Sequence, residues 1–208
     1  MTEVTGSSKS SRYDEILDSA QSFIQTRGYN GFSYRDIATA VGIKSASIHY
    51  HFPAKSDLGQ AVAARYCDHF SLLLRKITQG STSAKLMLES YTRLFRDTLV
   101  ERKKLCLCGV LAGEVETLPE AVRQEIVRFF DQQEAWLTKT IQSGIDSGEI
   151  LIGVDANRWA TTLLSSLEGG MLVAKSLGNY QNFDIVAESL LDMLFATDLQ
   201  AGSDLRVG

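Results

Sequence analysis

Residues 32–58 read FSYRDIATAVGIKSASIHYHFPAKSDL and carry the clearest local signals in the chain. Ser33 followed by Asp36 has the spacing of a capping box, which starts a helix, and Gly42 is suited to end that helix two turns later. A second, shorter helix is predicted at 45–51, because the proline that soon follows disfavours a helical residue before it. A two-turn helix, a glycine turn and a short helix make up a helix-turn-helix unit, whose second helix enters the major groove of DNA.

The rest of the chain has the apolar periodicity of helices. Only two prolines interrupt its 208 residues, and proline is the residue that breaks helix interiors. No convincing segment alternates apolar and polar residues with the period of a strand, so the predicted fold class is all-α. The expected helices are 12–27, 34–41, 45–51, 54–80, 84–102, 105–116, 119–147, 155–176 and 183–196.

Charge is spread unevenly along the chain. The net charge is −4, but residues 1–55 hold six Lys/Arg against five Asp/Glu, and residues 56–208 hold 15 against 20. A phosphate-binding surface is therefore expected only near the N-terminus. The sequence lacks both an apolar run of roughly 20 residues, which a membrane span needs, and a signal-peptide core. Three cysteines without a framework spacing indicate thiols in a reducing compartment, so we expect a cytoplasmic protein without a membrane partner.

The helix at 45–51 is predicted to turn a polar face toward double-stranded DNA. Ile48 and Phe52 are four residues apart and should point inward together. Side chains at the start of the helix are expected to read base edges, and those around it to contact phosphates. The expected base-reading residues are Lys44, Ser45, Ala46 and Ser47; the expected phosphate contacts are Arg35, His49, Tyr50 and Lys55; and Ser33, Tyr34 and His51 complete the predicted interface.

Several of these residues have alternative roles. Arg35 is expected either to contact a phosphate or to pair with a carboxylate of the first helix. His51 is expected either to contact DNA or to pack with a hydrogen bond to the backbone, and Tyr34 either faces DNA or is exposed without a contact. His49 and His51 are two residues apart and diverge on a helix, so we predict no metal site and no cofactor.

The same stretch resembles the N-terminal domain of the tetracycline-repressor family of bacterial regulators. The matching residues are Arg-Asp-Ile-Ala at 35–38, Gly42-Ile43, Tyr50-His51-Phe52, and Lys55 with Leu58. The resemblance, which covers residues 12–60, implies a homodimer with two recognition helices. It also implies a C-terminal ligand-binding domain where an inducer would release DNA. We therefore expect a DNA-binding domain at 1–55 and a ligand-binding and dimerisation domain at 56–208, and the Ser/Thr-rich composition of 1–11 predicts that this segment is disordered. His49 stands where the family usually has tyrosine, so we expect DNA affinity to depend on pH.

Two cysteines close together, Cys106 and Cys108, are the chief candidates for a chemical sensor. They are expected either to be small buried apolar side chains or to include a redox or electrophile sensor. Segment 106–123 resembles the ligand domain of a subgroup that includes electrophile-responsive repressors, with Cys106 as the matching residue. Lys103, Lys104 and Lys175 are the candidate cations that would lower the pKa of Cys106, and the resemblance implies that Lys175 lies near it. Cys67 is expected to be structural.

Large apolar residues of the C-terminal region are expected either to line a ligand cavity or to form ordinary core. Two nearby carboxylates, Glu114 and Glu116, would either meet a cationic ligand or lie on a solvated face. The apolar candidates are Tyr91, Phe95, Leu107, Leu111, Phe129, Phe130, Trp136 and Trp159.

The last two helices are predicted to form a dimer interface. Gly169 and Gly170 each cost a helix about 1 kcal/mol relative to alanine, which close approach to another helix would explain. The final helix at 183–196 carries more apolar residues than one buried face requires. Together these features predict a four-helix interface between two chains, with packing inside one chain as the alternative.

We therefore predict a dimeric, ligand- or redox-responsive transcriptional regulator and not an enzyme. It would act as a repressor that binds a palindromic operator and is released by a small-molecule or electrophile inducer. One alternative is a cysteine-dependent enzyme with Cys106 as the nucleophile, which a turnover assay would reveal. The other is a helical protein-binding module without DNA binding, which a weak salt dependence of DNA retention would favour.

Overall fold

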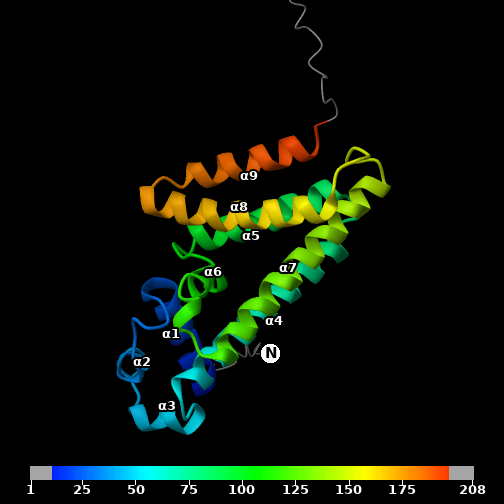
Figure 1. The fold of residues 1–208 in the computed structure, drawn as a ribbon. Coiled ribbons are helices and arrows are strands. Elements are labelled where there is room, and N and C mark those ends of the chain that lie inside the picture. Colours follow the sequence, from blue (N-terminus) through cyan, green and yellow to red (C-terminus); the bar gives the residue numbers. More distant parts are fainter. Residues whose placement is uncertain (1–10, 197–208) are drawn as a thin grey trace, which may run out of the picture. The chain divides into compact units, whose positions relative to one another are not determined.

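A computed structural model describes residues 11–196, and within that range the chain forms helices and connecting turns without a β-strand (Figure 1). The predicted all-α class is confirmed. The elements of this range are α1 (Arg12–Arg27), α2 (Tyr34–Val41), α3 (Ser45–His51), α4 (Lys55–Gly80), α5 (Ala84–Val100), α6 (Leu107–Ala112), the 3-10 helix η1 (Val115–Thr117), α7 (Glu120–Asp146), α8 (Ala156–Leu177) and α9 (Gln181–Leu194).

The predicted disordered start at 1–11 lies outside the described residues, with Ser11 as the exception. Ser11 is the N-cap of α1, and its hydroxyl accepts a hydrogen bond of 3.2 Å from the backbone N–H of Asp14. None of the helices described in residues 11–196 combines the length and the apolar character needed to cross a membrane.

The chain divides into two compact units. The first runs to Phe70 and also takes in Lys104–Phe129, and the second comprises Ser71–Lys103 and the chain from Phe130 onward. The predicted functional boundary after residue 55 falls at the start of α4, inside the first unit. Division of the chain into a DNA-binding part at 1–55 and a ligand-binding part at 56–208 stays a prediction.

The first unit contains the predicted helix-turn-helix, formed by α2 and α3 and supported by α1. Ser33 and Asp36 make a complete capping box, in which each side chain bonds the backbone N–H of the other. The hydrogen bonds from Ser33 hold the pKa of Asp36 below its usual value. Gly42 ends α2 with φ of 73°, a left-handed conformation in which a side chain would be strained. This local chemistry fixes the angle at which α3 leaves α2.

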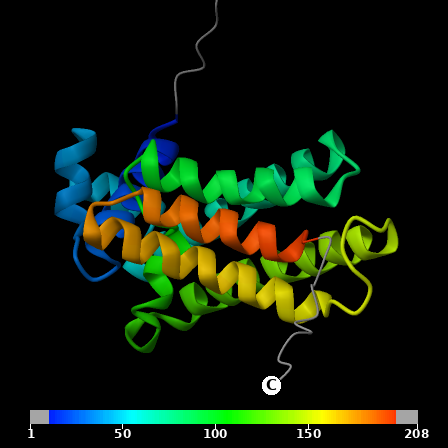
Figure 2. The ribbon, with the colours of Figure 1, turned by 90° about the horizontal axis from the view of Figure 1, so that it is seen from above.

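The second unit packs α5, α8 and α9 together, and α8 and α9 lie side by side in both views (Figures 1 and 2). A Cβ on Gly170 would make ordinary contacts at 3.5 Å with Phe183 and Val186 of α9, and one on Gly169 would meet open space. Packing inside one chain therefore requires neither glycine.

Apolar side chains remain uncovered on the outer side of α8 and α9. Gly169, Val173 and Leu177 follow one another at successive turns of α8, and Ile185 and Met193 are two turns apart on α9. Val173 and Leu177 are 55% and 66% exposed, and Ile185 and Met193 are each 59% exposed. We call these five residues the α8–α9 outer face. Exposed apolar residues on both helices suit a surface that a partner covers, and the location of the dimer interface on α8 and α9 stays a prediction.

Candidate functional site

The short helix α3 presents a polar surface because its other side is anchored in the core of the first unit. Ile48 is fully buried and Phe52, which ends the helix, is 3% exposed, as their spacing predicted. Ser45 is half-buried in the first turn, whereas Tyr50 is 84% exposed. The exposed members of the predicted interface on or next to α3 are Lys44, Ala46, Ser47, His49, Tyr50 and His51. Small side chains with exposed hydroxyl, imidazole and ammonium donors suit a surface that approaches base edges and phosphates.

Tyr34, which was also predicted at the interface, is engaged inside the unit. Its hydroxyl lies 2.9 Å from the backbone carbonyl of Phe52 and 2.7 Å from that of Ala54, so it ties the start of α2 to the segment after α3. Burial, and then the negative charge of Asp57, raise the pKa of Tyr34 to about 12. Its ring meets the ring of His49 edge-on, with 4.6 Å between centroids.

Lys55 lies at the start of α4 and is also engaged. Its ammonium donates a hydrogen bond to the backbone carbonyl of Phe32 and lies over two aromatic rings, 4.2 Å from the centroid of Phe32 and 4.9 Å from that of Tyr29. Burial lowers the pKa of Lys55, although the charges of Glu114 and Asp36 oppose that shift. The expected phosphate contact of Lys55 stays a prediction.

The alternatives left open for Arg35 and His51 now have a structural context. Arg35 is exposed, and within residues 11–196 no ion pair joins it to a carboxylate of α1; it is Arg27 that approaches Asp36, at 4.0 Å. The exposed His51 ring meets Tyr13 of α1 edge-on, with 5.8 Å between centroids. Arg35 and His51 are therefore both exposed, and their contacts with DNA stay predictions.

The three cysteines of the chain are all buried in the first unit as free thiols. Cys106 is the N-cap of α6, and the hydroxyl of Tyr66 lies 3.7 Å from its sulfur. Cys67 of α4 donates to the backbone carbonyl of Glu125 at 3.4 Å, and a hydrogen bond with Cys108 lowers the pKa of Cys67. Sequence spacing gave no sign that Cys67 lies beside Cys108, because 41 positions separate them in the chain.

The ammonium of Lys175 has a partner inside the second unit, where it donates a hydrogen bond to the backbone carbonyl of Lys103. Cys106 belongs to the first unit, so the implied proximity of Lys175 to Cys106 stays a prediction. Among the described residues, no three His, Cys, Asp or Glu side chains form a group that could hold a metal ion.

The second unit gathers three of the predicted aromatic ligand residues. Tyr91 lies between Phe95, at 5.2 Å, and Trp136, which stacks on it with centroids 5.4 Å apart. The indole N–H of Trp136 donates to the hydroxyl of Thr78 at 3.0 Å, and Trp136 lines a groove of about 450 Å³ between α4 and α7. Phe130 and Trp159 are half-buried elsewhere in this unit, whereas Leu111 is buried in α6 of the first unit.

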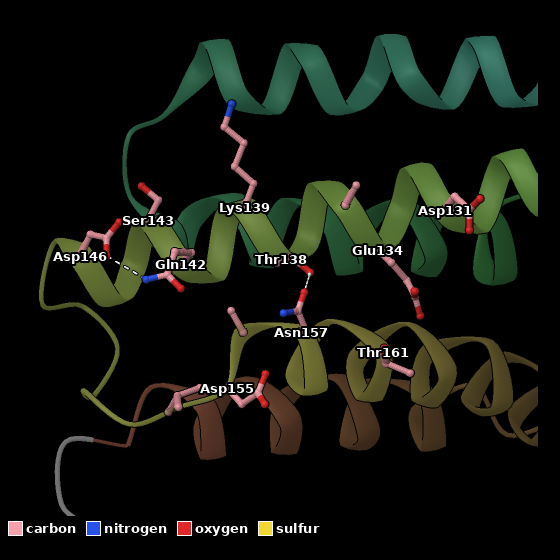
Figure 3. Close-up of a pocket in the computed structure, with 13 residues that line it drawn as sticks. Asp131, Glu134, Thr138, Lys139, Gln142, Ser143, Asp146, Asp155, Asn157 and Thr161 are labelled. Atoms are coloured by element: carbon pink, nitrogen blue, oxygen red, sulfur yellow. Dashed lines mark hydrogen bonds between the residues drawn. The ribbon is translucent and has the colours of Figure 1, made fainter.

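A larger groove of about 960 Å³ lies between α7 and α8 and was not expected from the sequence (Figure 3). Its lining includes four carboxylates, from Asp131, Glu134, Asp146 and Asp155, and one ammonium, from Lys139. Two of its residues bridge the helices, since the hydroxyl of Thr138 lies 3.3 Å from the side-chain oxygen of Asn157. This acidic groove is open and polar, unlike the apolar pockets that hold most small ligands.

Comparison with known proteins matches both parts of the chain. Residues 16–62 match the family described as bacterial regulatory proteins, tetR family, and residues 85–190 match the tetracyclin repressor-like C-terminal domain. The HTH-type transcriptional repressor DhaR of Mycobacterium sp. (strain GP1) is 30% identical over 79% of this chain and 85% of that protein.

Solved structures agree with this match. A TetR family regulator from Agrobacterium tumefaciens matches with a TM-score of 0.85 and 31% sequence identity. The match covers 88% of this chain and 97% of the Agrobacterium chain. A TetR regulator from Legionella pneumophila matches with a TM-score of 0.82 and 32% sequence identity, over 90% of this chain and 99% of the Legionella chain. The likeness extends well beyond the helix-turn-helix to the C-terminal helices.

Proposed function

Because the chain belongs to the TetR family of transcriptional regulators, we propose that it represses transcription by binding a palindromic operator as a homodimer and that an inducer releases it. Members of this family bind DNA operators and small molecules and are dimeric, and they are not enzymes. The observation that carries the proposal is the exposed polar surface of α3, held by the buried Ile48. We place this activity in the cytoplasm, where the three free thiols would stay reduced.

Selection of duplexes from a random-sequence pool tests this function directly. The protein is expected to enrich a palindromic sequence whose half-sites are about one helical turn apart or a multiple of it. If no duplex is retained even at low ionic strength, the chain is not an operator-binding regulator.

The residues of the predicted interface on and around α3 divide into two proposed roles. Lys44, Ser45, Ala46 and Ser47 lie at or before the first turn, where small side chains allow close approach to base edges. Arg35, His49, Tyr50 and Lys55 would position the protein through phosphates, with Ser33, Tyr34 and His51 at the edges of the interface. The internal hydrogen bonds of Tyr34 and Lys55 mean that these two residues also act by holding α2, α3 and α4 together.

Substitution of Ser47 tests base reading. Ser47→Ala is expected to relax the preference at one or two positions of the operator, because it removes one exposed hydroxyl without disturbing the core. Tyr50→Phe, which also removes a single hydroxyl, is the matched control and should weaken binding to all sequences alike. The measurement is a competition assay with every single-base variant of the selected duplex. Uniform weakening by Ser47→Ala would contradict the base-reading role.

The inducer is proposed to bind the C-terminal domain, where the aromatic residues Tyr91, Phe95 and Trp136 lie together. Leu111, Phe130 and Trp159 remain proposed members of the ligand site. Cys106 is the proposed sensor if the inducer is an electrophile or oxidant, with Lys175 as the proposed cation beside it. Tyr66, whose hydroxyl lies at the sulfur of Cys106, would stabilise a thiolate there by donating a hydrogen bond.

Alkylation tests the sensor role of Cys106. N-ethylmaleimide is expected to release the wild-type protein from the selected duplex and to leave Cys106→Ser bound, because the thiolate is the nucleophile. Cys67→Ser and Cys108→Ser are matched controls, since both thiols are buried in the same unit. The rate of release is followed by fluorescence anisotropy. Equal release of Cys106→Ser would refute the role, and protection by Cys67→Ser would transfer it to Cys67.

A further inference from the structure

The carboxylate of Glu114 accepts three hydrogen bonds from the turn between α1 and α2. One oxygen accepts from the backbone N–H of Tyr29 at 2.9 Å, and the other accepts from the backbone and side-chain N–H groups of Asn30 at 3.2 and 3.0 Å. The Asn30 amide also donates to the hydroxyl of Thr117 at 3.0 Å. Hydrogen bonds to an ionised carboxylate are about twice as strong as neutral ones. We call this arrangement the Glu114 clamp.

The turn is shaped to receive that carboxylate. Gly28 has φ of 79° and ψ of 170°, a backbone conformation that is essentially restricted to glycine. A Cβ at Gly28 would lie 2.0 Å from a carboxylate oxygen of Glu114. Both the backbone conformation and the absence of a side chain at Gly28 therefore suit the clamp. An ordinary surface hydrogen bond requires neither of them.

The clamped turn is also the place where α4 is attached. Lys55, the first residue of α4, donates to the carbonyl of Phe32 and lies over the ring of Tyr29, so it contacts the same turn. The negative charge of Glu114 also favours the protonated form of Lys55 and so raises its pKa, against the effect of burial. The turn thus joins α1, the start of α2 and the start of α4, which together set the position of α3.

Glu114 itself lies just after α6, from which Gly113 separates it, and the N-cap of α6 is Cys106. A second tie lies at the other end of this segment, where the side-chain amide of Gln25 in α1 donates to the backbone carbonyl of Leu105 at 2.7 Å. The segment from Leu105 to Thr117 is therefore fastened to α1 and its following turn at both ends. Any displacement of α6 would be carried to the helix-turn-helix through these contacts.

We propose that Glu114 is a positioning residue for operator binding, which holds the helix-turn-helix to the α6 segment so that each responds to the other. The clamp keeps the α1–α2 turn in the operator-binding arrangement, and loss of the clamp leaves both parts folded with the turn no longer held to the α6 segment by Glu114. This inference rests on the proposed repressor function. From the sequence, Glu114 was expected either to meet a cationic ligand or to lie on a solvated face. Its hydrogen bonds to the turn between α1 and α2 correspond to neither role.

Linkage provides a test that a purely structural role would not satisfy. If the α6 segment affects operator affinity, operator binding must affect the α6 segment by the same free energy. In the wild-type protein, the selected duplex is therefore expected to slow amide hydrogen exchange in residues 107–117, although none of those residues is proposed to contact DNA.

The experiment compares wild type, Glu114→Ala, Glu114→Gln and Glu116→Gln with and without that duplex. Glu114→Ala should speed exchange at Tyr29 and Asn30, abolish the DNA-dependent slowing at 107–117, and raise the operator dissociation constant about tenfold. Glu114→Gln, which keeps the shape and one acceptor, should show a smaller rise of about threefold and guards against misfolding of the alanine variant. Glu116, an exposed neighbour with no side-chain hydrogen bond within residues 11–196, is the matched control and should leave every readout unchanged.

The outcomes separate this inference from the proposed function. If wild type binds a duplex and both Glu114 variants keep the DNA-dependent slowing at 107–117, the linking role is overturned and the repressor function stands. The linking role is overturned in the same way if wild type binds a duplex and shows no such slowing. If wild type binds no duplex at all, the proposed function fails and the inference fails with it.

Discussion

Val173→Asp is expected to dissociate the dimer and to weaken operator binding by about 100-fold or more. Val173 lies in the α8–α9 outer face and is 55% exposed, so an aspartate there folds without strain in the single chain but places a charge in the proposed interface. Two linked recognition helices bind with about 10²–10⁴ times the affinity of one, because the second binding event is then intramolecular. Sedimentation and an operator titration at the same protein concentration would measure both effects.

The matched control for this substitution is Thr161→Asp. Thr161 is also an exposed β-branched residue of α8, but it lines the acidic groove with α7 (Figure 3). It should leave the dimer and operator affinity close to those of wild type. A dimeric Val173→Asp protein, or equal dissociation by both variants, would show that the α8–α9 outer face is not the dimer interface.

Ile48→Ala is expected to lower the free energy of unfolding by about 3 kcal/mol, since truncation of a buried isoleucine removes apolar burial and leaves a cavity. Ile48 is the fully buried residue of α3, so its loss should loosen the recognition helix more than the rest of the chain. Urea denaturation measures the stability, and hydrogen exchange of residues 45–51 measures the local loosening. Operator affinity should fall with it, because fewer molecules then hold α3 in a binding-competent position.

The neighbouring variant Ser47→Ala serves as the control for stability. It creates the same side chain one residue earlier, at an exposed site, and should change the free energy of unfolding by about 0.5 kcal/mol or less. A loss of less than about 1 kcal/mol in Ile48→Ala would show that α3 is held by other contacts than this core residue.

Features written in neighbouring residues could be predicted from the sequence. The capping box of Ser33 and Asp36, the left-handed Gly42, and the limits of α3 at Ser45 and His51 all agree with the structure. Each depends on backbone chemistry within four residues, which pattern and residue type specify well. The longer helices were also predicted to within a few residues for the same reason, with the largest differences at the ends of the segment that became α6.

Features that depend on contacts between distant residues were not predictable in this way. Glu114 lies 85 positions from Tyr29, and no periodicity links a carboxylate to a turn at that distance. The internal bonds of Tyr34 and Lys55 were missed because exposed polar residues and polar residues tied to the backbone look alike in sequence. The residues expected at a ligand site were chosen for their size and apolar character, which core residues share.

The stoichiometry of the DNA complex tests the account most directly. The protein should sediment with the duplex that it selects as a complex of two chains per duplex, and its affinity should fall steeply as salt rises because phosphate contacts release counterions. A single chain per duplex, or binding that salt does not weaken, would contradict the claim that two copies of α3 read a symmetric operator.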